Sequence, residues 1–185
     1  MQYRGWYGQN SGKSNWKPQS SRWKGRGGDH EGLDLFCKSM TPLYAVATGY
    51  AEYNDTRNPD GWGNFIMQYF KKDNITYAAV YAHLDASSKF SKSKLFAAGS
   101  QIGTSGCSGN AGKKGVCHRN FKCAEYTCIE DHLHLELLKL KPNGKVDKKV
   151  NPQDFFSWDI KFEKDNTNEI CSKANLQYQT IMTPT

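Results

Sequence analysis

Residues 131–137 read DHLHLEL, a stretch in which apolar and polar residues alternate. Leucines alternate with His132, His134 and Glu136, a period of two that predicts a β-strand. One face of that strand is apolar, and the other carries two imidazoles and a carboxylate. An ordinary solvated sheet face is one explanation for the polar side. Because the chain has only five histidines, two of them on one strand face also suggest a functional site.

The composition is that of one globular domain with short extensions. The chain has 185 residues, of which 37% are hydrophobic and 13% aromatic. This length and composition are enough to bury a core, and we find no apolar run long enough to span a membrane. The formal net charge of +7 favours anionic partners such as nucleic acid, acidic lipid or an acidic cell-wall polymer. Simple solubility explains the charge equally well.

Residues 1–24 form a basic, Gly/Ser-rich segment without the apolar stretch of a signal peptide. We expect either that a signal precedes this sequence or that export uses another route. Tryptophans among its lysines and arginines could stack on nucleic-acid bases. Because no nucleic-acid-binding fold is recognisable, we expect no nucleic-acid partner and interpret the segment as a lead-in to the domain.

Six cysteines are present, and none of them forms a CxxC pair. A structural zinc site usually contains such a pair, so the cysteines favour disulfides and an oxidising compartment. Fifteen pairings are open to six cysteines. We predict that Cys37 pairs with Cys171, and that the other four pair locally: Cys107, Cys117, Cys123 and Cys128.

Short strands separated by turns dominate the remaining sequence, which predicts a mainly β fold with antiparallel pairing. The first half of 87–103 is also compatible with a helix. We expect strands at 43–53, 64–70, 75–84, near 101–104 and at 132–140, with turns at 58–63, 71–74 and 141–145.

A second candidate group lies in DHEGLDLF (29–36), where Asp34 follows His30 by four residues. On a strand these two positions share a face. Imidazole and carboxylate ligands suit a cation such as zinc, although a surface hydrogen bond between the two side chains is the simpler explanation. His83 ends the apolar strand at 80–85, and taken alone it is an ordinary strand-end histidine.

Over residues 26–156 the chain resembles the lysostaphin/LytM-type zinc endopeptidases, which cut peptidoglycan cross-bridges. The likeness runs, in order, through HEGLD, TPLYAVATGYAEY, GWGNFIMQYF, YAHL, AAGSQIGTSG with SGNAG, HLHLEL and VNPQDFF. Fragments such as GTSG are unspecific, whereas three histidine motifs in this order are specific. The resemblance implies a peptidase domain at 25–157, built as an antiparallel sheet or β-sandwich with few short helices and an open active-site groove.

The resemblance also assigns the polar residues. It makes His30, Asp34 and His134 the ligands of a catalytic Zn²⁺, with an open coordination position for water. It places His83 and His132 beside the metal as catalytic histidines, one to accept a proton and one to stabilise the oxyanion, without deciding which does which. No HExxH helix is present.

Three features depart from the family pattern or have no assigned role. Residues 112–131 form a cysteine-rich insertion before the histidine strand, and His118 within it has no counterpart in the family motifs. We interpret this loop as shaping substrate choice or contacting a cognate inhibitor, or else as merely stabilising the domain. Glu136 could orient a ligand from behind or have a plain structural role. Residues 158–185 form a C-terminal extension.

The implied function is a zinc-dependent peptidoglycan hydrolase that cleaves peptide bonds in cross-links or stem peptides. We expect a monomer that is secreted or periplasmic, with peptidoglycan as partner. Delivery into a rival cell's periplasm as an antibacterial toxin, with a cognate immunity protein, would fit the missing signal peptide. The alternative is a catalytically inactive module that binds peptidoglycan or regulates another wall hydrolase. The sequence does not specify which peptide bond is cut.

Overall fold

The computed structural model describes residues 31–36, 39–56, 61–111 and 132–156. The predicted N-terminal segment, the 112–131 insertion and the C-terminal extension lie outside these residues, as does the predicted Cys37–Cys171 disulfide. Within the described part of the chain, no helix is long and apolar enough to cross a membrane.

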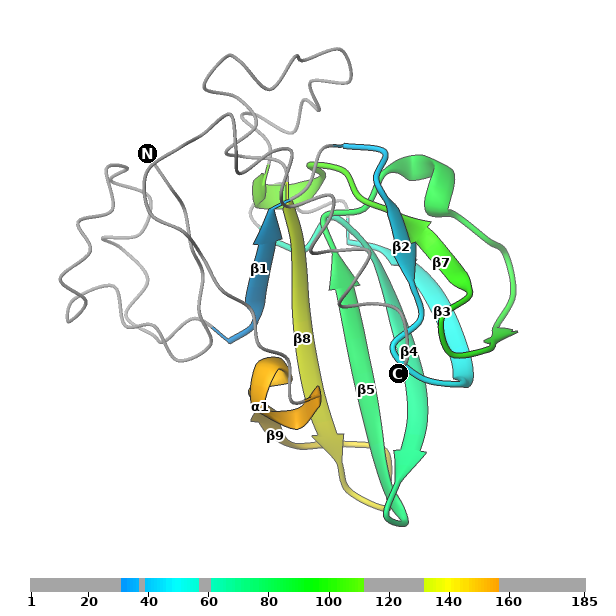
Figure 1. The fold of residues 1–185 in the computed structure, drawn as a ribbon, viewed down its shortest axis with the longest axis vertical. Coiled ribbons are helices and arrows are strands. Elements are labelled where there is room, and N and C mark those ends of the chain that lie inside the picture. The colour runs from blue at the N-terminus through cyan, green and yellow to red at the C-terminus, as the bar shows by residue number, and fades with distance from the viewer. Residues whose placement is uncertain (1–30, 37–38, 57–60, 112–131, 157–185) are drawn as a thin grey trace, which may run out of the picture.

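The described elements are nine strands, two short 3₁₀ turns and one short helix (Figure 1). Their bounds are β1 (Leu33–Phe36), β2 (Pro42–Tyr44), β3 (Gly49–Asp55), β4 (Asn64–Lys72), β5 (Ile75–Ala82), η2 (Ala86–Ser88), β6 (Lys94–Phe96), β7 (Gln101–Thr104), η3 (Gly109–Ala111), β8 (His132–Leu140), β9 (Val146–Val150) and α1 (Pro152–Phe156). The prediction of a mainly β fold with few short helices is therefore confirmed.

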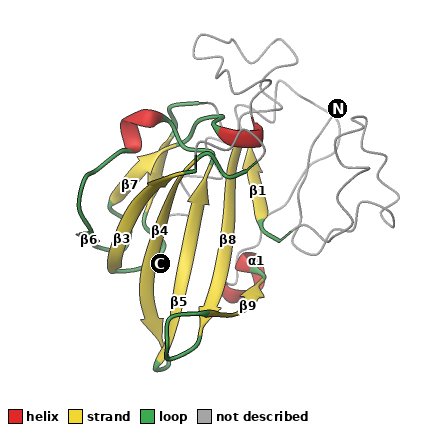
Figure 2. Ribbon diagram, turned by 180° about the vertical axis from the view of Figure 1, so that it is seen from behind, coloured by secondary structure: helices red, strands yellow, loops and turns green. Residues whose placement is uncertain are grey.

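Seven strands form one antiparallel sheet in the order β1-β8-β5-β4-β3-β6, with β9 also paired to β8 (Figure 2). Strands β2 and β7 form a separate two-stranded antiparallel sheet. The predicted strands at 64–70, 75–84, 101–104 and 132–140 correspond to β4, β5, β7 and β8. The antiparallel pairing predicted from the sequence is confirmed.

The prediction of one strand over 43–53 is wrong, because this stretch forms two strands in two different sheets. Directly after β2, Ala45 forms two backbone hydrogen bonds with the turn at 97–100. At Gly49, where β3 begins, a Cβ atom would lie 2.0 Å from the carbonyl oxygen of Tyr69. The chain can therefore change sheets here because a glycine permits this close approach to β4.

The helix considered for the first half of 87–103 is reduced to the single turn η2. Asp85 caps this turn by accepting a hydrogen bond from the backbone N–H of Ser87. The chain then continues into the short edge strand β6. The serines and lysines between these elements provide no apolar stripe that a longer helix could bury.

Leucines alternate as predicted in the first part of β8 and pack on one face of the large sheet, whereas Leu138 and Leu140 belong to a second buried cluster. Leu133, Leu135 and Leu137 are each 0% exposed, in a core that includes Leu43 of β2 and Ile102 of β7. The small sheet therefore covers this face. Burying each leucine contributes about 1.5–3 kcal/mol, so the alternation fixes which face of this part of β8 packs into the core between the two sheets.

Strands β1 and β9 share one edge of β8, one after the other (Figure 1). Strand β1 pairs with the first half of β8, up to Leu135, and β9 pairs with the second half, from Leu137 onward. Glu136 lies at the break between the two pairings. The ends of β1 and β9 therefore meet beside this residue.

Candidate active site

The register between β1 and β8 brings Asp34 directly opposite His134. Asp34 Oδ1 lies 2.7 Å from His134 Nδ1, and the two residues are 4% and 8% exposed. Opposite residues of an antiparallel pair point to the same face of the sheet. The pair therefore lies on the face opposite the leucine core.

Gly32, the glycine of the HEGLD motif, makes room for the His134 ring. A Cβ at this position would lie 2.5 Å from Cε1 and 2.7 Å from Nε2 of that ring. Real Cβ atoms do not approach so closely, and the ring is confined by its polar contacts. The glycine is thus a steric requirement of the histidine site.

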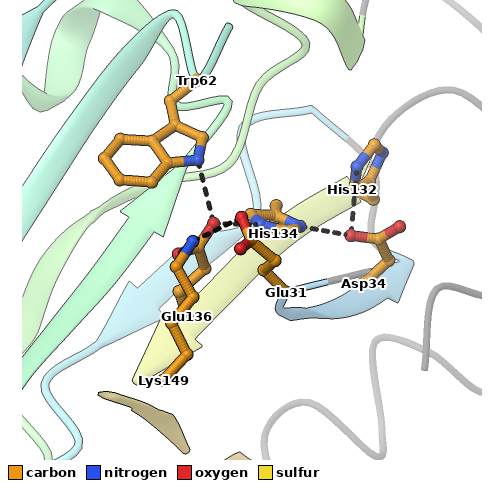
Figure 3. Close-up of polar contacts among 7 residues, drawn as sticks. All are labelled: Glu31, Asp34, Trp62, His132, His134, Glu136 and Lys149. Atoms are coloured by element: carbon orange, nitrogen blue, oxygen red, sulfur yellow. Dashed lines mark hydrogen bonds and ion pairs between the residues drawn. The ribbon is translucent and has the colours of Figure 1, made fainter. Parts of the chain in front are cut away.

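His132 lies on the same strand face, two residues before His134. Its Nε2 is 3.6 Å from Asp34 Oδ1, so one carboxylate oxygen faces both histidines (Figure 3). The His132 side chain is 15% exposed and is the more accessible of the two. It can therefore reach a substrate that lies over the sheet.

His83 joins the group from the end of β5, with a backbone φ of 62°. This left-handed conformation is uncommon for a residue with a side chain and is typical of functional sites. The backbone N–H donates to the carbonyl of Trp62 at 2.9 Å, which holds the turn. The ring centroid lies 4.8 Å from that of His132 and 5.7 Å from that of His134.

One ring nitrogen of His83 forms a hydrogen bond with the backbone. His83 Nδ1 lies 2.9 Å from the carbonyl oxygen of Ser108, and because that oxygen can only accept, Nδ1 carries the proton. Burial, together with the neighbouring His132 and His134, holds the pKa of His83 well below its usual value. The ring is therefore neutral and leaves the Nε2 lone pair available as a proton acceptor.

Two glycine-containing loops position Ser108 and Trp62. Gly63 and Gly109 both have φ values of +65°, and a Cβ on Gly63 would lie 2.3 Å from the backbone nitrogen of Gly109. Asn110 donates its backbone N–H to the carbonyl of Gly61 at 3.0 Å. The GWG and SGN sequences therefore meet backbone to backbone, which requires glycine on both sides.

Glu136 contacts the far side of His134. Its Oε1 lies 3.0 Å from His134 Nε2 and accepts a hydrogen bond from Trp62 Nε1 at 3.1 Å (Figure 3). Its Oε2 lies 2.8 Å from Lys149 Nζ, an ion pair outside hydrogen-bond geometry. Burial raises the pKa of Glu136, but the contacts with His134 and Lys149 more than offset it and hold the pKa below its usual value.

The two carboxylates create an environment that favours positive charge at His134. Burial lowers the pKa of this histidine, but hydrogen bonds and charge from Asp34 and Glu136 raise it to about 9. The imidazole nitrogen and the carboxylate oxygen, which face each other across 2.7 Å, are also types of atom that zinc binds as ligands. The pair therefore fits the predicted cation.

The structure brings together four of the five predicted site residues: Asp34, His83, His132 and His134. The third predicted ligand, His30, lies outside the described residues, as does His118. Among the residues that are described, no group of three His, Cys, Asp or Glu side chains is arranged to hold a metal. The ligand roles therefore remain predictions.

Sequence reasoning missed three residues of this site: Trp62, Ser108 and Lys149. The GWG and SGN motifs marked the loops of the first two but not their contacts. Lys149 is one of several lysines in the sequence and gave no signal. The position of Glu136 on the histidine face of the predicted strand was the signal that the sequence offered for this residue. Its contact with His134 is known only from the structure.

Comparison with known proteins places the chain among the peptidases. Residues 28–152 match the model of peptidase family M23, which is more than half of the chain. The chain therefore belongs to peptidase family M23. No curated protein sequence matches it.

Two similar solved structures come from Staphylococcus simulans. The catalytic domain of the antimicrobial peptidase lysostaphin is 23% identical with a TM-score of 0.48, covering 70% of this chain and 80% of that one. A structure of lysostaphin is 22% identical with a TM-score of 0.49, covering 83% of this chain and 49% of that one.

Proposed function

We propose that the chain is a zinc-dependent peptidoglycan hydrolase that cleaves peptide bonds in wall cross-links or stem peptides. The observation that carries the proposal is the convergence of His83, His132 and His134 with Asp34 on one face of the sheet, in a chain of family M23. Three imidazoles and a carboxylate in one place provide both metal donors and groups that transfer protons.

In this proposal Asp34 and His134 hold the zinc ion together with His30. When bound, zinc acts as a Lewis acid that lowers the pKa of water toward about 7. Asp34 Oδ1 and His134 Nδ1 are the facing donor atoms of the described part of the site. Gly32 keeps the His134 ring in place, because any larger residue would displace it.

The other two histidines act on protons. His83 is held with Nδ1–H on the carbonyl of Ser108, so its Nε2 is the atom that accepts a proton from the attacking water. His132 is more accessible and lies beside the same carboxylate. It is placed to donate to the oxygen of the scissile carbonyl as negative charge develops there.

Action outside the cytoplasm agrees with two further observations. The net charge of +7 suits an acidic wall polymer. Cys107 is buried and disulfide-bonded, which suits an oxidising compartment. We extend the proposal to a secreted or periplasmic enzyme. Delivery as a toxin, and a cognate inhibitor that contacts the 112–131 loop, belong to the same proposal.

The test is digestion of purified peptidoglycans of defined cross-link, with mass spectrometry of the released fragments. We expect new amino termini from one kind of peptide bond, no release after treatment with a chelator, and recovery when Zn²⁺ is restored. The mass of the fragments identifies the bond. A parent protein that binds peptidoglycan but releases no fragments with zinc present would instead be an inactive wall-binding module.

A further inference from the structure

We propose that Glu136 is a positioning residue that fixes which nitrogen of His134 faces the metal, and that Lys149 holds Glu136 in place. The inference rests on the proposed function, because it concerns the same zinc site. It assigns a role to β9 and to Lys149, which lie beyond the histidine motifs.

The two nitrogens of His134 have different partners. Nδ1 faces Asp34 Oδ1 at 2.7 Å, and Nε2 faces Glu136 Oε1 at 3.0 Å. When the ring is neutral, one nitrogen carries a proton and the other a lone pair. A proton on Nε2 that is donated to Glu136 leaves the lone pair of Nδ1 directed toward Asp34, another of the three predicted ligands. A carboxylate on the second nitrogen also makes the imidazole a better ligand.

Glu136 is itself held on both oxygens. Trp62 Nε1 donates to Oε1 at 3.1 Å, and Lys149 Nζ lies 2.8 Å from Oε2. Because the residue is only 2% exposed, a carboxylate without a cation at this position would be costly. The charge of Lys149 therefore allows Glu136 to remain ionised behind the histidine.

The break in strand pairing explains how Lys149 reaches this site. Lys149 pairs with Leu138 across β8 and β9, so it shares a sheet face with Glu136, two residues away. Its Nζ also lies 2.6 Å from Glu31 Oε2, just before β1. Lys149, on β9, thus contacts both Glu31, in the segment before β1, and Glu136 (Figure 3). Glu136 is the one residue of β8 (His132–Leu140) that lies between the pairing with β1 and the pairing with β9.

A purely structural ion pair is the competing explanation, and it predicts different measurements. We would compare Glu136→Gln, Lys149→Met and Lys149→Arg with the control Lys148→Met, whose lysine is the exposed neighbour on β9. The first readout is Zn²⁺ affinity, from competition with a chromophoric chelator. The second is the long-range ¹H–¹⁵N correlation of His134 in the zinc-loaded protein, which shows which nitrogen carries the proton.

We expect the parent to show zinc on Nδ1 and the proton on Nε2. Zn²⁺ affinity should fall about 10- to 100-fold in Glu136→Gln and about tenfold in Lys149→Met. Lys149→Arg and Lys148→Met should stay within about twofold of the parent, because the charge at 149 is kept in both.

Two results would overturn the inference: a zinc-loaded parent with the proton on Nδ1, or a Glu136→Gln protein that keeps the parent's affinity and loses only thermal stability. Failure of the proposed function is distinguishable. A zinc-loaded parent with the expected correlation and the expected loss in Glu136→Gln would support the positioning role even if no peptidoglycan were cleaved.

Discussion

Asp34 Oδ1 and His134 Nδ1 lie 2.7 Å apart, although 100 positions separate the two residues in the sequence. The β1–β8 register creates this contact, since it places the two residues opposite each other. The contact joins the HEGLD motif to the HLH motif.

Removal of either of the two facing predicted ligands, Asp34 or His134, should abolish Zn²⁺ binding. We expect Asp34→Ala and His134→Ala to lose Zn²⁺ binding and wall lysis together, because each variant removes one of the predicted protein ligands. Metal content after gel filtration and a lysis assay would check this. Full zinc content in either variant would contradict the ligand assignment.

Substitution of the two proposed catalytic histidines should separate Zn²⁺ binding from turnover. We expect His83→Ala and His132→Ala to retain Zn²⁺ and to lose about 10²–10⁴-fold in hydrolysis rate, the range for a general acid or base. Zinc content and initial rates on one purified peptidoglycan give the two readouts. A His83→Ala protein that digested this substrate at the parent rate would show that the role assigned to His83 is wrong.

Gly32→Ala should damage the site through steric displacement of His134. A Cβ would lie 2.5 Å from Cε1 of that ring, so we expect Zn²⁺ affinity to fall at least about tenfold, the scale seen when the support of a ligand is lost. Gly144→Ala is the matched control, since a Cβ there meets nothing within 4 Å. Its φ of +77° predicts a loss of about 1 kcal/mol in unfolding free energy, with zinc affinity unchanged.

Leu135→Ala should test the apolar face of β8. Leu135 is 0% exposed within the core, so its truncation should lower the unfolding free energy by about 2–5 kcal/mol. Leu95→Ala, at a position 54% exposed, should change it by less than about 0.5 kcal/mol. Urea unfolding followed by tryptophan fluorescence measures both values, and equal losses would contradict the assignment of the buried face.

Tyr81→Phe should reveal the cost of a broken buried network. The Tyr81 hydroxyl donates to Gln68 Oε1 at 2.9 Å and accepts from the backbone N–H of Val46 at 2.8 Å. Its loss leaves both partners without this contact, so we expect a destabilisation of about 1–3 kcal/mol. Zn²⁺ affinity should remain at the parent value, and a large change in it would contradict the separation of core and site.

Local sequence pattern was sufficient for much of the fold. The period of two in 132–137 predicted a strand with one apolar face, and the first part of β8 has that form because leucines and polar groups alternate there; beyond Leu137 the pattern breaks, and Leu138 and Leu140 belong to a second buried cluster. The same logic failed at 43–53, where the residues suit a strand throughout. The division between β2 and β3 depends on the close approach of Gly49 to β4, a contact between distant segments.

The sequence alone was enough to predict most of the strands and the chemistry available to them: strands with alternating residues, glycines where the backbone must turn or approach closely, and a small set of histidines. The tertiary structure decided which groups meet. Asp34 reaches His134 through strand register, His83 is oriented by Ser108, and Lys149 reaches Glu136 because β1 and β9 share an edge of β8. Periodicity is a local property of the chain, whereas these contacts arise from pairing between segments far apart in sequence, which no local pattern encodes.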